Sequence, residues 1–286
     1  MLARYRTQGS WLVLAVALWA SFPFAWAGGE DDLVGLINDY RAAPHECEGR
    51  LEAMAGPLTP SAALAAVDPG ASRSLGEALS AGGYRAAAAT TIIFSGPGDA
   101  AQALRLIEPR YCRSLLDPRY SQIGVGRSLG AWRINLARPL LPADLGDGRT
   151  AGKAILRLVN EARSRLRRCG AEAFAAAAPL AWNEALAEAA LAHSRDMAQQ
   201  NYFSHADPSG RSAALRARQA GYRWSHVGEN IAAGLGAPEQ VVAGWLASPG
   251  HCANIMAPEF VDMGAAYATN RASAMGVYWT QVFGAR

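Results

Sequence analysis

Two imidazoles and one carboxylate are the side chains of this sequence whose types and spacing best suit them for chemistry. His205 lies in the segment YFSHADP, Glu229 in GENIA and His251 in SPGHCANIM. Two histidines and a glutamate are a common ligand set for a divalent ion such as zinc, with the remaining positions left to water. Without a metal, the same groups are suited to acid–base work. The alternative is a hydrogen-bonded polar cluster that only fixes the shape of a cleft.

Covalent catalysis is not indicated by the sequence. Ser204 and Ser248 adjoin histidines only in sequence, and Cys252 is expected in a disulfide. His193 shares the inner face of a predicted helix with apolar residues, so we expect a core histidine there. His226 is expected on the surface.

The chain contains an internal repeat. The early matches, at a constant offset of 122 residues, are Asn38 with Asn160, Cys47 with Cys169 and Pro57 with Pro179. The later matches, at offsets of 138 to 147 residues, are Gly83 with Gly221, Cys112 with Cys252, Gly124 with Gly264 and Trp132 with Trp279. The growing offset implies insertions in the second copy, the largest being 16 residues between Leu180 and Gly221. An ordered set of matches predicts a duplication.

The repeat also selects a disulfide pairing. Cysteines in an exported chain meet an oxidising compartment, and four of them allow three pairings. Each copy has one early and one late cysteine, so the natural pairs are Cys47–Cys112 and Cys169–Cys252. The alternative is four buried free thiols.

The second copy has its predicted helices first and its predicted strands last. Apolar spacing predicts a helix over residues 153–168, and Asn183 is suited to cap a helix that runs to about residue 199. Shorter helices are expected over 212–220 and 238–247, and strands over 263–269 and 275–283. This order favours an α+β layered domain with an antiparallel sheet.

Residues 153–286 resemble the CAP superfamily of cysteine-rich secretory, antigen 5 and pathogenesis-related proteins, and in particular its bacterial SCP-like branch. The resemblance is carried by residues 202–208, 228–232, 244–256 and 278–284, in that order and with that spacing. It implies an α+β fold of tandem CAP-type α-β-α sandwich domains with antiparallel central sheets. It also implies that His205, Glu229 and His251 lie at a shallow cleft.

The resemblance to the eukaryotic members is incomplete. Ser248 stands where they have a second acid, and Tyr278 stands where they have a cleft histidine on the last strand. The bacterial members resemble this chain in the histidine at the position of His251. The resemblance thus adds Ser248 and Tyr278 to the binding cleft and weakens the inference of conserved catalysis.

The first copy lacks the polar cluster. Its matching positions are Thr91 for Glu229, Tyr111 for His251 and Ala131 for Tyr278, and the stretch equivalent to His205 is deleted or replaced near Ala66. The cysteines, the glycines and Trp132 remain, so the fold does not require the cluster. This argues that the cluster has a role beyond scaffolding in the second copy.

The N-terminus has the pattern of a signal peptide over residues 1–27. Arg4 and Arg6 precede an apolar run over 11–24, and small residues follow at 25–27. The alternative is an uncleaved anchor, for which the run is short. Cleavage would lower the net charge from +3 to +1 by removing the two arginines. A nearly neutral mature chain lacks the large positive charge that is typical of nucleic-acid-binding proteins. No second apolar run could span a membrane, so we expect a secreted or periplasmic protein with no membrane span in its mature chain.

These observations predict a degenerate CAP-like domain over residues 28–141, a linker over 142–152 and a CAP domain over 153–286. The resemblance implies binding of a lipid, a cell-wall component or a protein at the cleft. Zinc or another divalent cation could be held there by His205 and His251, with Glu229 nearby. The alternative is a metal-dependent hydrolase that acts on peptides or cell wall, with Glu229 as its catalytic residue.

Overall fold

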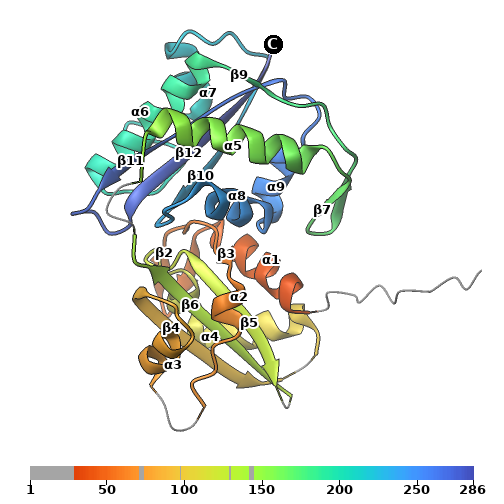
Figure 1. The fold of residues 1–286 in the computed structure, drawn as a ribbon, viewed down its shortest axis with the longest axis vertical. Coiled ribbons are helices and arrows are strands. Elements are labelled where there is room, and N and C mark those ends of the chain that lie inside the picture. The colour runs from red at the N-terminus through yellow and green to blue at the C-terminus, as the bar shows by residue number, and fades with distance from the viewer. Residues whose placement is uncertain (1–28, 71–73, 97, 129, 142–144) are drawn as a thin grey trace, which may run out of the picture.

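The computed structural model describes residues 29–70, 74–96, 98–128, 130–141 and 145–286. The predicted signal peptide, residues 1–27, lies outside the described residues. Two sheet-bearing bodies follow one another along the long axis of the molecule, the N-terminal body below and the C-terminal body above in Figure 1. The mixed α/β architecture with two mostly antiparallel sheets confirms the expected fold class.

The C-terminal body contains five helices and six strands among its described residues. In chain order they are α5 (Gly148–Arg163), β7 (Arg167–Cys169), β8 (Glu172–Phe174), β9 (Ala181–Trp182), α6 (Glu184–Gln200), α7 (Ala213–Gln219), β10 (His226–Ala233), α8 (Pro238–Leu246), α9 (Pro249–Met256), β11 (Asp262–Asn270) and β12 (Gly276–Ala285). The sheet has the order β10-β12-β11-β9, in which only the pair of β9 and β11 is parallel. Strands β7 and β8 form a separate hairpin.

Helices cover both faces of this sheet. Helix α6 packs on one face, where Ser194 donates to Thr280 of β12 at 2.8 Å. The close approach of α6 requires Gly264, because a Cβ there would lie 2.1 Å from the backbone nitrogen of Ala187. On the other face, α5, α8 and α9 enclose a core in which Trp245 and Trp279 are fully buried. These layers make the expected α-β-α sandwich.

The expected helices of this body are largely confirmed. Asn183 caps α6, since its side chain accepts a hydrogen bond from the backbone of Leu186. The helix expected over residues 153–168 is displaced: α5 begins at Gly148, after the capping residue Asp147, and ends at Arg163. Residues 167–169 instead pair with β8. The predicted linker over 142–152 therefore includes the first turn of a helix.

The N-terminal body has the same strand order as its neighbour. Its elements are α1 (Glu30–Arg41), β1 (His45–Cys47), β2 (Arg50–Glu52), β3 (Thr59–Pro60), α2 (Ala62–Ala65), α3 (Leu75–Ala81), β4 (Ala86–Ser95), α4 (Ala100–Leu115), β5 (Gln122–Ser128) and β6 (Ala131–Pro139). The sheet order is β4-β6-β5-β3 with β3 parallel to β5, which corresponds strand for strand to β10-β12-β11-β9.

Equivalent side chains make equivalent contacts in the two bodies. Asn38 exchanges two hydrogen bonds with the backbone of Leu58, and Asn160 does the same with Leu180. The buried Arg41 donates to the carbonyls of Gly56, Leu115, Asp117 and Tyr120, and the buried Arg163 donates to those of Ala178, Ile255, Ala257 and Phe260. Both predicted disulfides, Cys47–Cys112 and Cys169–Cys252, are present.

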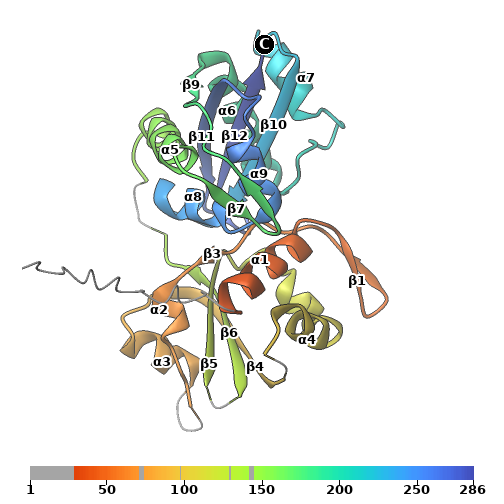
Figure 2. The ribbon, with the colours of Figure 1, turned by 90° about the vertical axis from the view of Figure 1, so that its right-hand side faces the viewer.

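Four hydrogen bonds between the described residues of the two bodies share one pattern, in which the N-terminal body supplies a side-chain donor and the C-terminal body a backbone carbonyl. The pairs are Asn38 with Ala247 at 3.1 Å, Thr59 with Gln240 at 2.8 Å, Ser121 with Gly234 at 2.9 Å and Arg138 with Ala274 at 2.6 Å. Figure 2 shows α1 and β3 at this junction, facing α8, α9 and β7.

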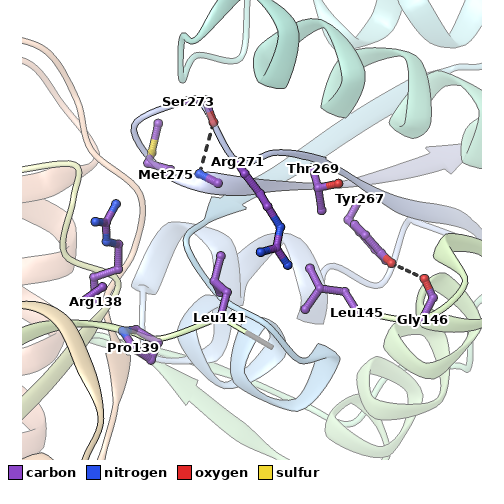
Figure 3. A pocket seen from close by; sticks show the side chains of 12 residues that line it. Arg138, Pro139, Leu141, Leu145, Gly146, Tyr267, Thr269, Arg271, Ser273 and Met275 are labelled. Atoms are coloured by element: carbon purple, nitrogen blue, oxygen red, sulfur yellow. Dashed lines mark hydrogen bonds between the residues drawn. The ribbon is translucent and has the colours of Figure 1, made fainter. Parts of the chain in front are cut away.

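The connection between the bodies borders a pocket of about 460 Å³ under the β11–β12 turn. Figure 3 shows Leu141 and Leu145 of the connection on either side of the Arg271 guanidinium, while Tyr267 donates to the carbonyl of Gly146. Among the described residues, no helix is long and apolar enough to cross a membrane.

Candidate functional site

Glu229 lies at the centre of a buried polar cluster. Its position on β10 faces α7 and the loop after α6, and only 3% of its side chain is exposed. His205 Nδ1 donates to Oε1 at 2.9 Å, and Arg216 Nη2 donates to Oε2 at 2.6 Å. His193 Nε2 lies 3.9 Å from Oε1. We call these four residues the Glu229 cluster.

His205 is held by both its ring and its backbone. Arg216 donates to its carbonyl at 2.9 Å, and His193 donates to the preceding carbonyl of Ser204 at 2.9 Å. Its side chain is nevertheless 44% exposed. Because a carboxylate only accepts, the ring proton on Nδ1 faces Glu229, and in the neutral ring Nε2 is left as an acceptor. A group held in this way can bind a donor, accept a proton or ligate an ion.

His251 extends the polar region on α9. Its Nδ1 lies 2.8 Å from Oγ of the buried Ser248, and its carbonyl accepts a hydrogen bond from Asn230 at 3.2 Å. Asn254 links the two regions by donating to the carbonyl of Glu229 and to the side chain of Asn230. Burial, and then the charge of His205, lower the pKa of His251 to about 3. This imidazole is therefore neutral at physiological pH.

The structure brings together most of the residues predicted from the sequence. His205 contacts Glu229 directly, Ser248 contacts His251, and the two pairs are linked through Asn230 and Asn254. Tyr278 lies apart from them. It is fully buried, its hydroxyl contacts Asn201 at 3.3 Å, and it pairs with Ala233 at the far end of β10 from Glu229.

Arg216 and His193 are the members of the cluster that sequence reasoning missed. Arg216 is 93% buried on α7, next to the buried Ala217, so the signal was a cation on the apolar stripe of a short helix. His193 is buried as expected for a core residue. Burial also lowers its pKa, although the nearby Glu229 opposes this shift. Where the loop that carries His205 turns back decides that His193 lies beside the Glu229 carboxylate. The local sequence pattern does not encode that turn.

The fit of this region to a metal ion is partial. Both carboxylate oxygens of Glu229 already accept hydrogen bonds, and the Arg216 cation opposes a second positive charge there. Among the described residues, no group of three or more histidine, cysteine, aspartate or glutamate side chains could hold a metal. The donors that remain for an ion are the imidazoles of His205 and His251, which would make an open and weak site completed by water.

The equivalent position in the N-terminal body lacks this chemistry. Glu229 pairs with Val282, which pairs with Gly264, and Thr91 occupies the corresponding place opposite Asn135 and Gly124. Helix α2 has 4 residues where α6 has 17. The additional turns and the loop after them carry His193 and His205. The cluster therefore depends on a segment with no counterpart in the N-terminal body.

Comparisons with known proteins find a family model that matches most of the C-terminal body. Residues 156–283 match the sequence model of the Cysteine-rich secretory protein family, CAP. A Bacillus subtilis protein, Uncharacterized protein YkwD, is 39% identical over 105 residues, which are 37% of this chain and 39% of that protein. Uncharacterized membrane protein YlbC of the same organism is 34% identical over 87 residues, 30% of this chain and 25% of that protein. The chain thus spans less than half the length of these relatives.

A similar solved structure is an extracellular protein containing a SCP domain from Bacillus anthracis. It has a TM-score of 0.41 and 26% identity over 55% of this chain and 53% of that chain. Residues 156–283 of this chain are thus similar to the CAP family over nearly the whole C-terminal body.

Proposed function

We propose that this protein is an extracytoplasmic binding protein whose CAP domain takes a polar ligand at a cleft formed by His205, Glu229 and His251. The observation that carries the proposal is the contrast within one network. Glu229 is 3% exposed and held by His205 and Arg216, whereas His205 itself is 44% exposed. A buried ion pair thus orients a single imidazole toward solvent, which is how a recognition group is kept in place.

The chemistry of His251 favours a ligand that donates hydrogen bonds. His205 Nδ1 donates to Glu229, which leaves Nε2 free to face a ligand. His251 is neutral because its pKa is held near 3. Of the three ligand classes that the family resemblance implies, cell-wall fragments present the most amide and hydroxyl donors. We therefore rank a cell-wall component first, ahead of a lipid or a protein.

The proposal also covers the N-terminal body, residues 28–141, as a degenerate CAP-like copy. The shared strand order and the equivalent contacts of Asn38 with Asn160, and of Arg41 with Arg163, support this. Its role would be to hold the CAP domain, since the segment that carries the cluster has no counterpart there. Export by cleavage of residues 1–27 is part of the same proposal, and the two disulfides are typical of an oxidising compartment.

The ligand proposal is tested by titrating the chain without residues 1–27 with soluble peptidoglycan fragments and with phosphatidylcholine vesicles. Histidine side-chain resonances are followed by NMR. We expect saturable shifts of His205 and His251 with the fragments, and a loss of binding of at least tenfold in His205→Ala.

The matched control for this test is His226→Ala, because His226 is an exposed imidazole at the start of β10. It should bind like the unchanged protein. Binding that survives His205→Ala, or a saturable response only to vesicles, would contradict the proposed cell-wall ligand.

A further inference from the structure

Strand β4 is an outer strand of the N-terminal sheet, and no strand of the described residues pairs with its other side (Figure 1). Its ladder with β6 shifts register between Ala86 and Ala88 and is regular from Ala88 to Ser95. Of its ten residues only Ile92 is buried. The free side of an outer strand presents unpaired N–H and C=O groups, so this edge can pair with a further strand.

The register of the sheet shows which residues of β4 point their backbone groups outward. Ser61 donates to the carbonyl of Ile123 at 2.8 Å, so the odd-numbered residues of β5 face β3 and the even-numbered ones face β6. The same alternation, carried through the β5–β6 and β4–β6 registers, leaves the even-numbered residues of β4 bonded to β6. Ala89, Thr91 and Ile93 therefore direct their N–H and C=O groups to the free side.

The equivalent edge of the C-terminal sheet is closed by side chains of α8 and α9. On β10, the carbonyl of Glu229 accepts a hydrogen bond from Asn254 at 3.2 Å. The carbonyl of Ile231 accepts one from Trp245 at 3.0 Å. The two matching carbonyls of β4 accept no side-chain donor in the described part of the chain. Strand β4 is therefore open along the edge where β10 is covered.

The exposure of Ile93 shows the same difference on the face of the sheet. Ile93 and Ile231 are equivalent, since each precedes the residue that pairs with the repeated tryptophan. Ile231 is fully buried in a cluster with Met197 of α6, whereas Ile93 is 51% exposed. Helix α2 has 4 residues where α6 has 17, so it is too short to cover Ile93 in this way. An apolar side chain thus lies uncovered beside the open edge.

The sequence of β4 is complementary to itself in the antiparallel direction. Its first four residues are alanines, and Ile-Ile-Phe follows after two threonines. The regular part of the strand is centred on Thr91, and a two-fold axis there places each bulky apolar residue opposite a smaller one. The pairs are Ala88 with Phe94, Ala89 with Ile93 and Thr90 with Ile92. Residues 86–95 carry no charge, so the pairing brings no like charges together.

We propose that β4 pairs with β4 of a second copy of this chain, antiparallel and centred on Thr91. The two four-stranded N-terminal sheets then form one sheet of eight strands. A two-fold pair uses the same edge of both copies, so it leaves this edge open in neither. The pairing does not depend on the cleft, because the Glu229 cluster lies in the C-terminal body. The dimer would carry two clefts.

The test measures the molar mass of the chain without residues 1–27 by sedimentation equilibrium from about 1 to 200 μM, a range that detects weak specific association. We expect a monomer–dimer equilibrium. Thr91→Pro should weaken the dimer at least tenfold, because it removes an outward N–H and no bond to β6. Ile93→Lys should weaken it at least tenfold, because it places a charge beside the pairing edge. Leu51→Lys, at a 72% exposed position on β2, should leave it unchanged.

The register is tested by cysteine cross-linking. A residue on the two-fold axis lies opposite itself, with Cα atoms about 5.5 Å apart in a hydrogen-bonded pair, which a disulfide can span. Oxidised Thr91→Cys should therefore form a covalent dimer. Ser95→Cys should not, because Ser95 is an exposed residue of the same strand that lies away from the axis.

A chain that stays monomeric over the whole concentration range would overturn the proposal. So would a dimer that neither Thr91→Pro nor Ile93→Lys weakens, since it would form through another surface. The lysine variant keeps the test decisive if the proline variant does not fold, because it changes an exposed side chain. Cross-linking through Ser95→Cys and not through Thr91→Cys would overturn the proposed register.

Discussion

The ring of Phe203 lies directly against Gly56 of the N-terminal body, so that a Cβ added to Gly56 would come within 3.2 Å of the ring's Cζ. Phe203 precedes His205 by two residues, and Arg41 fixes Gly56 through its carbonyl at 2.7 Å. Asn38 donates to Ala247, which precedes Ser248, the N-cap residue of α9. The N-terminal body thus contacts the loop that carries His205 and the start of the helix that carries His251.

Replacing Gly56 by leucine should disturb His205 without unfolding the protein. A side chain at Gly56 displaces Phe203 and, through it, the loop that presents the imidazole. We expect a changed NMR resonance of His205 and weaker ligand binding at the cleft. Gly76→Leu is the matched control, because Gly76 lies on the exposed face of α3 with no heavy atom within 4 Å of an added Cβ. Identical His205 resonances in both variants would show that the contact has no influence on the site.

Removing one member of the ion pair between Arg216 and Glu229 should be costly. Arg216→Met leaves a buried carboxylate without its cation, so we expect a loss of about 3–5 kcal/mol in the free energy of unfolding by urea denaturation. Adding Glu229→Gln should recover part of this loss, because the second change removes the unpaired charge. Arg218→Met, on the exposed face of the same helix, should stay within about 0.5 kcal/mol. If the losses in the free energy of unfolding of the two single variants add up to the loss in the double variant, Arg216 and Glu229 are not coupled.

The free energy of unfolding should decrease as the pH is lowered through the range set by the His251 pKa. Its pKa is lowered from 6.5 to about 3 in the folded protein, so between these values the unfolded chain binds the extra proton. Stability from this group is complete above pH 6.5 and is lost progressively as the pH falls toward 3. Because Asn lacks the titrating ring and retains a hydrogen-bonding atom near Nδ1, His251→Asn should flatten this part of the curve. Thermal unfolding between pH 3 and 8 measures the difference, and parallel curves would rule out the depressed pKa.

Zinc should bind weakly and only through the two cleft imidazoles. His251 is neutral over the whole neutral range and needs no deprotonation to ligate, and His205 presents Nε2. Calorimetry should give a small heat with the unchanged protein and none with His205→Ala combined with His251→Ala. His226→Ala should retain the heat. An unchanged zinc titration in the double variant would eliminate the metal proposal.

Much of this arrangement was predictable because it follows from local patterns. The cap at Asn183, the strands over 263–269 and 275–283, and the cysteine pairs of the two halves were read from spacing and repetition. The helix start at Gly148 was missed, because Asp147 caps it within a stretch rich in residues that also form turns. From the sequence alone such a stretch is expected to be a loop, and its helical structure depends on packing against β11.

The sequence by itself determined which residues could do chemistry, since His205, Glu229 and His251 stand in long ordered segments. Only the tertiary structure decided that Arg216 neutralises Glu229, that Tyr278 lies at the far end of β10, and that Gly56 supports Phe203. These relationships join residues that approach one another when helices close on a sheet or when one body docks on the next. Their distances depend on packing, and residue spacing along the chain carries no information about it.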